Sequence, residues 1–172
     1  MENGNIVVLF RCPAPESGEF MYKRTLMHAE TVEIPRRIAE QIELNDLNIA
    51  RVVAHIRAIA PKLIVTCARG SSSHAATYAK YLFELTLGVP VATFAPSVAS
   101  IYGARLKFEG TLFLAISQSG RSPDLIASAT VARDCGAYVV AIVNDEESPL
   151  CAIAHDVIPI RAGPEQSVAA TK

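Results

Sequence analysis

Residues 111–122 read TLFLAISQSGRS, an apolar run that passes directly into a short polar loop. A strand buried on both faces of a parallel sheet is apolar throughout, whereas a strand with one solvated face alternates. Pro123 follows Ser122, and this pair is typical of the N-cap and first position of a helix. The stretch therefore predicts a buried strand, a tight turn and a helix in succession.

The same succession repeats on both sides of this stretch. Four further apolar runs occur, at residues 63–67, 91–94, 138–143 and 157–160. Pro159 suits an edge strand, because proline cannot donate to a sheet ladder. Helical patterns separate the runs, at about residues 73–87, 96–104 and 122–135. Alternating strands and helices predict an α/β fold, a three-layer α-β-α sandwich around a five-stranded parallel sheet.

Residues 21–60 predict N-terminal helices that precede the sheet domain at 61–172. Isoleucine recurs every fourth residue, at positions 34, 38 and 42. A second apolar stripe follows Asp46, which we interpret as the N-cap of a second helix. Pro35 either interrupts the first helix or lies in the first turn of the next. Residues 1–20 have no periodicity, and we interpret them as a tail.

The composition describes one ordinary globular domain. The chain has 172 residues, 51% of them hydrophobic, with a mean hydropathy of +0.28 and a net charge of −1. Its 16 basic residues are scattered, whereas a nucleic-acid surface normally gathers them on one face. No apolar run approaches the roughly 20 residues that a membrane span needs. We therefore expect neither a nucleic-acid nor a membrane partner.

The cysteines give no sign of a metal centre or a disulfide framework. They form no CxxC pair and no metal-ligand spacing. We interpret Cys67 and Cys135 as small buried apolar residues. Unpaired thiols, together with the lack of a secretory leader, favour the cytoplasm. We expect no metal and no cofactor.

Two strand-to-helix loops carry the polar residues expected at the ligand-binding edge of a parallel sheet. They read RGSSS at 69–73 and SQSGRS at 117–122. Gly70 and Gly120 allow tight turns. The serine hydroxyls and the N–H groups of each following helix offer donors, and the helix dipole adds about half a positive charge. Gln118 can bind a sugar hydroxyl, so the loops predict a phosphate site beside a sugar.

Other interpretations of the loops remain open. One serine-rich loop is an ordinary helix cap, but two at one sheet edge favour an anion site. Neither loop matches the nucleotide motifs GxGxxG or GxxxxGK[ST], so a nucleotide-binding domain is the weaker alternative. His74, Arg69 and Arg121 either reach the ligand or are solvated, and Asp124 suits the helix dipole. Nothing assigns a base to the serines, which are not expected to be nucleophiles.

Three segments in order resemble a known family. They are CARGSSSHAATYAKYLFE (67–84), AISQSGRSPD (115–124) and AGPEQSVAATK (162–172). They resemble the first SIS (sugar isomerase) domain of the two-domain sugar isomerases. That group includes the isomerase half of glucosamine-6-phosphate synthase (glutamine–fructose-6-phosphate aminotransferase) and the glucosamine-6-phosphate deaminases without a glutaminase. The resemblance covers residues 21–172 and implies an SIS-type, Rossmann-like fold.

The resemblance also implies which residues bind substrate. The family's phosphosugar contacts fall on Ser71, Ser72, Ser117, Gln118, Ser119, Ser122, Val168 and Ala170. With the turn glycines Gly70 and Gly120, these are our candidate substrate-binding residues. In the family the catalytic glutamate and the ring-opening histidine belong to the second SIS domain. We therefore assign no catalytic residue and expect an SIS domain truncated at its C-terminal end, which binds without turnover.

The resulting hypothesis is a phosphosugar-binding module of an aldose–ketose isomerase or deaminase. The implied chemistry interconverts glucosamine 6-phosphate and fructose 6-phosphate. The alternative is a non-catalytic domain that senses a phosphosugar and regulates another activity. Because a truncated domain would leave an apolar face bare, we expect a homodimer or a second SIS-domain chain as partner.

Overall fold

The structure is a computed structural model that describes residues 25–167. The tail expected at residues 1–20 and the candidate residues Val168 and Ala170 lie outside the described residues. The elements, in chain order, are α1 (Leu26–Ile59), β1 (Leu63–Ala68), α2 (Ser72–Leu87), β2 (Val91–Thr93), α3 (Pro96–Ser100), β3 (Thr111–Ser117), α4 (Pro123–Asp134), β4 (Tyr138–Val143), α5 (Pro149–Ile153) and β5 (Asp156–Pro159).

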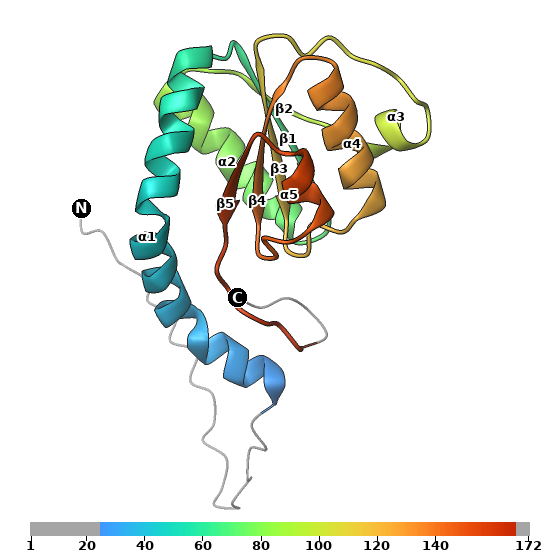
Figure 1. Cartoon of the computed structure of the whole chain (residues 1–172). Helices are drawn as coiled ribbons and strands as arrows, with labels where there is room; N and C mark the ends of the chain where they lie inside the picture. Colours follow the sequence, from blue (N-terminus) through green and yellow to red (C-terminus); the bar gives the residue numbers. More distant parts are fainter. Residues whose placement is uncertain (1–24, 168–172) are drawn as a thin grey trace, which may run out of the picture.

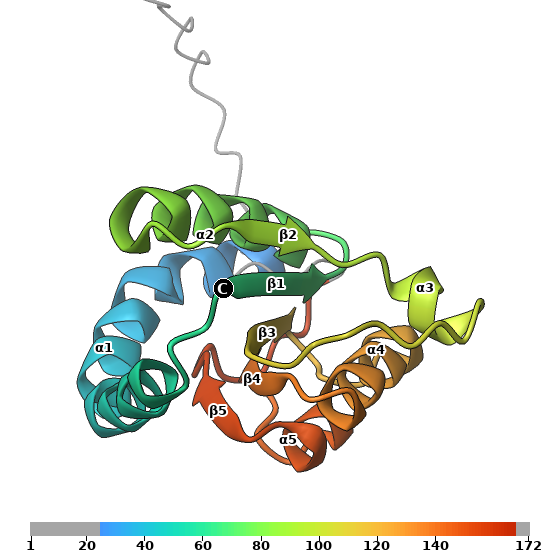
Figure 2. The same ribbon diagram turned by 90° about the horizontal axis from the view of Figure 1, so that it is seen from above.

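The five strands form one parallel sheet in the order β2-β1-β3-β4-β5. Helices α1 and α2 cover one face, while α3, α4 and α5 cover the other (Figures 1 and 2). The predicted α-β-α sandwich is confirmed. All five predicted strands are present, with ends that differ by at most one residue from those expected.

The central strand β3 explains why the apolar runs are unbroken. All seven of its residues are buried. Phe113 and its alternate neighbours pack beneath α4 and α5, whereas Leu112 and Leu114 belong to the core beneath α1 and α2. The Phe113 ring lies 5.7 Å from that of Phe94 and 5.9 Å from that of Phe108, both edge-on. A polar residue on either face of β3 would therefore enter a core.

The expected pair of N-terminal helices is one continuous helix, α1, of 34 residues. Thr25 is its N-cap, and its hydroxyl accepts from the backbone N–H of His28 at 3.2 Å. The helix runs through Pro35 and Asp46 without a break. Asn45, one residue before Asp46, is buried and donates to the carbonyl of Pro159 at 2.6 Å. Packing against β5 thus overrides the local signal for a new helix start.

Two smaller differences concern short elements. Helix α3 ends at Ser100 and not at residue 104, and the five-residue helix α5 was not expected. Five residues are too few to display a helical period, although Ser148 and Pro149 form the same N-cap pair that marks α4. None of the helices within residues 25–167 is long and apolar enough to cross a membrane.

A buried carboxylate joins α1 to the amino ends of β4 and β5. The Asp156 side chain is only 4% exposed and accepts from Arg51 Nε at 3.1 Å and from the Tyr138 hydroxyl at 2.6 Å. His55 Nδ1 lies 2.7 Å from the same carboxylate. Burial acts to raise the pKa of Asp156, but the hydrogen bonds and positive charges outweigh it and lower the pKa. Burial and the neighbouring carboxylate raise the pKa of Tyr138 to about 12.

Candidate functional site

The two serine loops meet at the carboxyl edge of the sheet. They follow β1 and β3, which are adjacent parallel strands paired up to Ala68 and Ile116. Between them lies a pocket of about 190 Å³. Its lining consists of Arg69, Gly70, Ser71, Ser72, Ile116, Ser117, Gln118, Ser119, Ser122 and Leu125. The structure therefore brings together seven of the candidate residues, from two loops about 50 positions apart in the chain.

A second pocket of about 160 Å³ adjoins the first and shares Ser71, Ser72 and Gln118 with it. The other lining residues are Asn144, Ile160, Ala162 and Glu165. None of these four residues was predicted from the sequence. Asn144 follows the last residue of β4, so the rule that ligands bind beyond the carboxyl ends of strands would have found it. The remaining three lie beyond β5.

Gly120 shapes the second loop and does not line the pocket. Its φ is +63°, in the left-handed region that favours glycine. A Cβ at this position would lie 2.1 Å from Ser148 Oγ. The Gly120 N–H donates to Ser117 Oγ at 3.0 Å, and its carbonyl accepts from the N–H of Leu150 at 3.3 Å. Only glycine fits where the loop turns back against α5.

The serines fall into two groups. Ser117 and Ser119 accept loop N–H groups, from Gly120 at 3.0 Å and from Arg121 at 3.3 Å. Ser71 and Ser122 are the N-cap residues of α2 and α4, but their hydroxyls do not cap the helices. These two hydroxyls can therefore donate to a ligand at the positive ends of two helix dipoles.

Both loop arginines are paired with acidic residues. Arg69 Nη1 lies 2.7 Å from Asp124 Oδ2 and so joins the first loop to the first turn of α4. Arg121 contacts Asp145 at 2.7 Å, and its hydrogen bond lowers the pKa of that carboxyl. His74 is exposed in the first turn of α2. The pocket therefore offers an anion mainly neutral donors and helix dipoles.

The three cysteines within residues 25–167, Cys67, Cys135 and Cys151, are free thiols. Cys67 is fully buried at the end of β1, and burial raises the pKa of its thiol to about 12, so the thiol is protonated. Its interpretation as a buried apolar residue is confirmed. Within residues 25–167, no group of three or more His, Cys, Asp or Glu side chains is placed to hold a metal ion.

A parallel α/β sheet with two serine loops that converge on one pocket is an arrangement typical of domains that bind small anions. The profile of the SIS domain family matches residues 59–172. The chain therefore belongs to the SIS domain family.

Relatives of known sequence and structure agree with this assignment. Glutamine–fructose-6-phosphate aminotransferase from Symbiobacterium thermophilum is 40% identical over 121 residues, which are 69% of this chain and 19% of that protein. A candidate phosphosugar isomerase from Silicibacter pomeroyi superimposes with a TM-score of 0.81 at 46% identity, covering 84% of this chain and 44% of that one.

The C-terminal domain of glucosamine-fructose-6-phosphate aminotransferase from Francisella tularensis gives a TM-score of 0.75 at 26% identity, covering 90% of this chain and 44% of that one. The chain thus spans less than half the length of these relatives.

Proposed function

We propose that this domain binds a phosphorylated sugar, with the phosphate between the two serine loops and the sugar in the adjoining pocket. The observation that carries the proposal is the convergence of both loops on one pocket of about 190 Å³. Hydroxyls and N–H groups at two helix starts match a phosphate dianion. Gln118 and Asn144, which line the second pocket, can donate to or accept from sugar hydroxyls.

We further propose that the ligand is an amino-sugar or hexose 6-phosphate, such as glucosamine 6-phosphate or fructose 6-phosphate. The relatives from Symbiobacterium thermophilum and Francisella tularensis are named as aminotransferases of fructose 6-phosphate. Glu165, in the second pocket, supports an amino sugar, because a carboxylate can pair with an ammonium group. A regulatory domain that senses the same ligand would share this site and differ by binding DNA or another protein.

Thermal unfolding with added ligand tests the site. We expect fructose 6-phosphate or glucosamine 6-phosphate to raise the melting temperature of the wild type. Ser71→Ala and Ser119→Ala should each weaken binding by about tenfold, the effect of losing one hydrogen bond to a charged group. Ser100→Ala is the matched control, because this exposed serine lies on α3, away from both pockets. Unchanged affinity in both loop variants would place the site elsewhere.

Further measurements distinguish the proposed function from a nucleotide-binding domain and from a regulatory domain. Stabilisation by NAD or ATP, without any by hexose phosphates, would favour a nucleotide domain. Binding of a phosphosugar without its conversion would agree with a domain whose catalytic partners come from a second SIS domain. Deamination of glucosamine 6-phosphate by this chain would contradict that division, and a salt-dependent DNA complex would favour the regulatory alternative.

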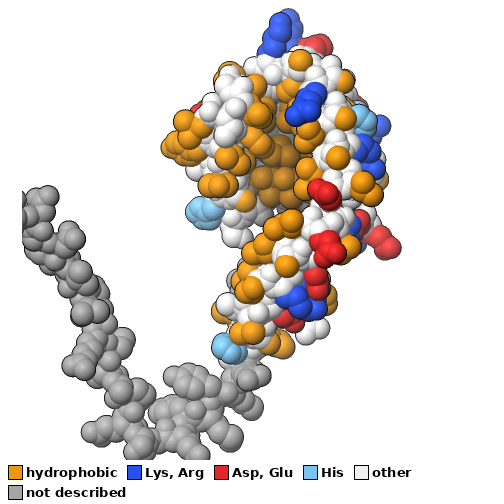
Figure 3. Space-filling model, turned by 90° about the vertical axis from the view of Figure 1, so that its left-hand side faces the viewer, with side chains coloured by type: hydrophobic (Ala, Val, Ile, Leu, Met, Phe, Trp, Pro, Cys, Tyr) orange, Lys and Arg blue, Asp and Glu red, His pale blue; other side chains and the backbone are white. Residues whose placement is uncertain are grey.

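We propose a second copy of this chain as a partner. Apolar side chains gather around a hollow on the face that carries α1 (Figure 3). A groove of about 400 Å³ lies between the carboxyl ends of α1 and α2, and its lining includes Ile56 of α1 and Phe83 of α2. Leu85 on α2 and Leu47 on α1 are 84% and 87% exposed. Apolar exposure of this extent is typical of surfaces that bind another protein.

Light scattering tests this association. We expect a mass near twice 18.5 kDa at micromolar concentration. Leu85→Lys should shift the protein toward the monomer, since a charge in a desolvated contact is unfavourable. Glu43→Lys, a charge change at an exposed position of α1, is the control. A wild type that stays monomeric over the same range would refute the proposed homodimer.

A further inference from the structure

One wall of the second pocket has no sheet or helix to support it. Residues 161–167 follow β5 and have no regular secondary structure, yet Ala162 and Glu165 line the pocket. A segment without a backbone ladder takes its position from individual side-chain contacts. Those contacts therefore determine whether this wall of the pocket is formed.

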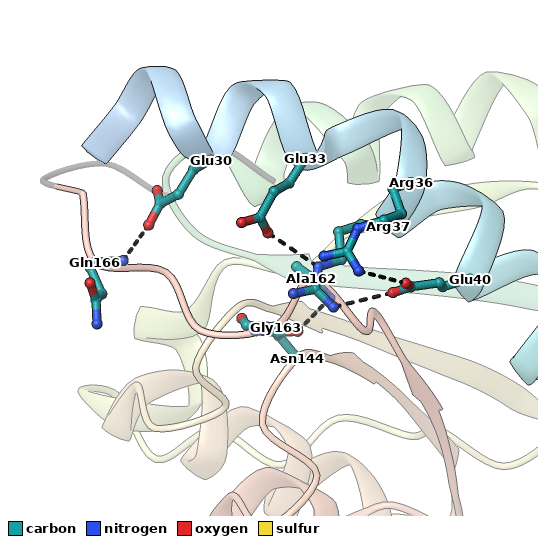
Figure 4. Close-up of polar contacts among 9 residues, drawn as sticks. All are labelled: Glu30, Glu33, Arg36, Arg37, Glu40, Asn144, Ala162, Gly163 and Gln166. Atoms are coloured by element: carbon teal, nitrogen blue, oxygen red, sulfur yellow. Dashed lines mark hydrogen bonds and ion pairs between the residues drawn. The ribbon is translucent and has the colours of Figure 1, made fainter. Parts of the chain in front are cut away.

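The first contacts come from the sheet. Asn144, which follows β4, donates from Nδ2 to the carbonyl of Gly163 and accepts at Oδ1 from the N–H of Ala162, both at 2.8 Å. The Asn144 side chain thus pairs with one backbone N–H group and one backbone carbonyl of the segment (Figure 4). This pairing fixes the beginning of the wall.

The far end is held by α1. The Glu30 carboxylate accepts from the N–H of Gln166 at 2.5 Å, from the N–H of Ser167 at 3.3 Å and from the Ser167 hydroxyl at 2.5 Å. Figure 4 shows Glu30 pointing from α1 toward Gln166. Glu30 as a whole residue is only 6% exposed. Hydrogen bonds to a shielded carboxylate are stronger than those between neutral groups.

Helix α1 also approaches the middle of the segment. Gly163 has a φ of +76°, and a Cβ there would lie 2.8 Å from Nη2 of Arg37. Arg37 is itself held by Glu33 at 3.3 Å and by Glu40 at 3.2 Å, one turn away on either side. The segment consequently lies between α1 and the β4 loop and contacts both.

We propose that Glu30 is a positioning residue of the phosphosugar site, which fixes the wall formed by Ala162 and Glu165 without lining either pocket. The inference rests on the proposed function of the site. A carboxylate that binds two consecutive N–H groups and a hydroxyl fixes both position and orientation of the peptide at 166–167. Because linkage is reciprocal, ligand in the pocket should in turn strengthen the contact between α1 and this segment.

Hydrogen exchange and ligand affinity, measured on the full chain, test the role of Glu30. Glu30→Ala should speed exchange of the Gln166 and Ser167 amides at least tenfold and weaken fructose 6-phosphate binding about tenfold, a typical coupling. Glu30→Gln, which keeps an acceptor oxygen, should restore part of both. Glu43→Ala on the same helix is the control, because Glu43 is exposed and takes no part in the hydrogen bonds that hold residues 161–167.

The outcomes are distinguishable. Fast exchange confined to 166–167 together with weaker binding supports the inference. Unchanged affinity in Glu30→Ala, when the wild type binds, overturns it and leaves the proposed function intact. Faster exchange throughout the sheet would reveal a general loss of stability and would overturn the positioning role as well. A wild type that binds no phosphosugar contradicts the proposed function itself.

Discussion

Gly120→Ala is expected to lower the free energy of unfolding by about 3 kcal/mol and to abolish phosphosugar binding. Part of the loss comes from the backbone, because a φ of +63° is unfavourable for any residue with a Cβ. The rest is steric. The new methyl group would lie 2.1 Å from Ser148 Oγ, 2.6 Å from Ser148 Cβ and 2.9 Å from Val143 Cγ2. Ser148 is buried, so it cannot move aside freely.

Gly88→Ala provides the matched control for this change. Gly88 has nearly the same φ, +65°, but a Cβ there would meet no atom within 4 Å. Its substitution should cost about 1 kcal/mol from the backbone alone and leave binding unchanged. Urea unfolding gives the two free energies, and ligand titration gives the two affinities. Equal effects of both substitutions would contradict the steric account of the second loop.

Asp156→Asn is expected to destabilise the fold by about 2 kcal/mol near neutral pH. The amide keeps the shape of the carboxylate but turns an NH₂ group toward Arg51, His55 or Tyr138, all of which need an acceptor there. The loss stays below that of a fully buried ion pair, since Arg51 and His55 are about half exposed and can be rehydrated.

The same carboxylate gives the stability a defined dependence on pH. The folded state lowers the pKa of Asp156, so the unfolded chain takes up its proton first as the pH falls. Its contribution is complete above the unfolded pKa, about 4, and disappears as the pH falls through the folded value. Urea midpoints between neutral and acidic pH should therefore decline more steeply for the wild type than for Asp156→Asn. Asp46→Asn, at an exposed position on α1, should retain the wild-type slope.

The sheet and its serine loops could be predicted because their signals are local. The run at 111–116 is apolar on both faces, and Ser122 with Pro123 marks the next helix. Both features can be recognised within about a dozen consecutive residues. The continuous course of α1 through Asp46 could not be predicted, because Asn45 finds its partner, Pro159, 114 positions away.

The residues of the second pocket and its support likewise divide into those with a local sequence signal and those placed by long-range contacts. Asn144 directly follows a predicted strand, so it could have been predicted by the same rule as the serines, that ligands bind beyond the carboxyl ends of parallel strands. The role of Glu30 could not be predicted, because its contact with Gln166 joins residues 136 positions apart and leaves no periodic pattern in the sequence. Glu165 belongs to the segment 162–172 that resembles the family, but nothing in the neighbouring residues indicated that it would line a pocket.

The contacts of α1 also bear on how the chain is synthesised. The helix precedes every strand, yet its polar partners Asp156, Pro159 and Gln166 are 105, 114 and 136 positions downstream. During translation, α1 must therefore remain without these polar partners until β5 and the residues that follow it have left the ribosome. Closing loops of this length is entropically unfavourable and makes docking of α1 a late event in folding. Until then, the nascent chain depends on dilution or chaperones to keep the apolar surface of α1 from aggregating.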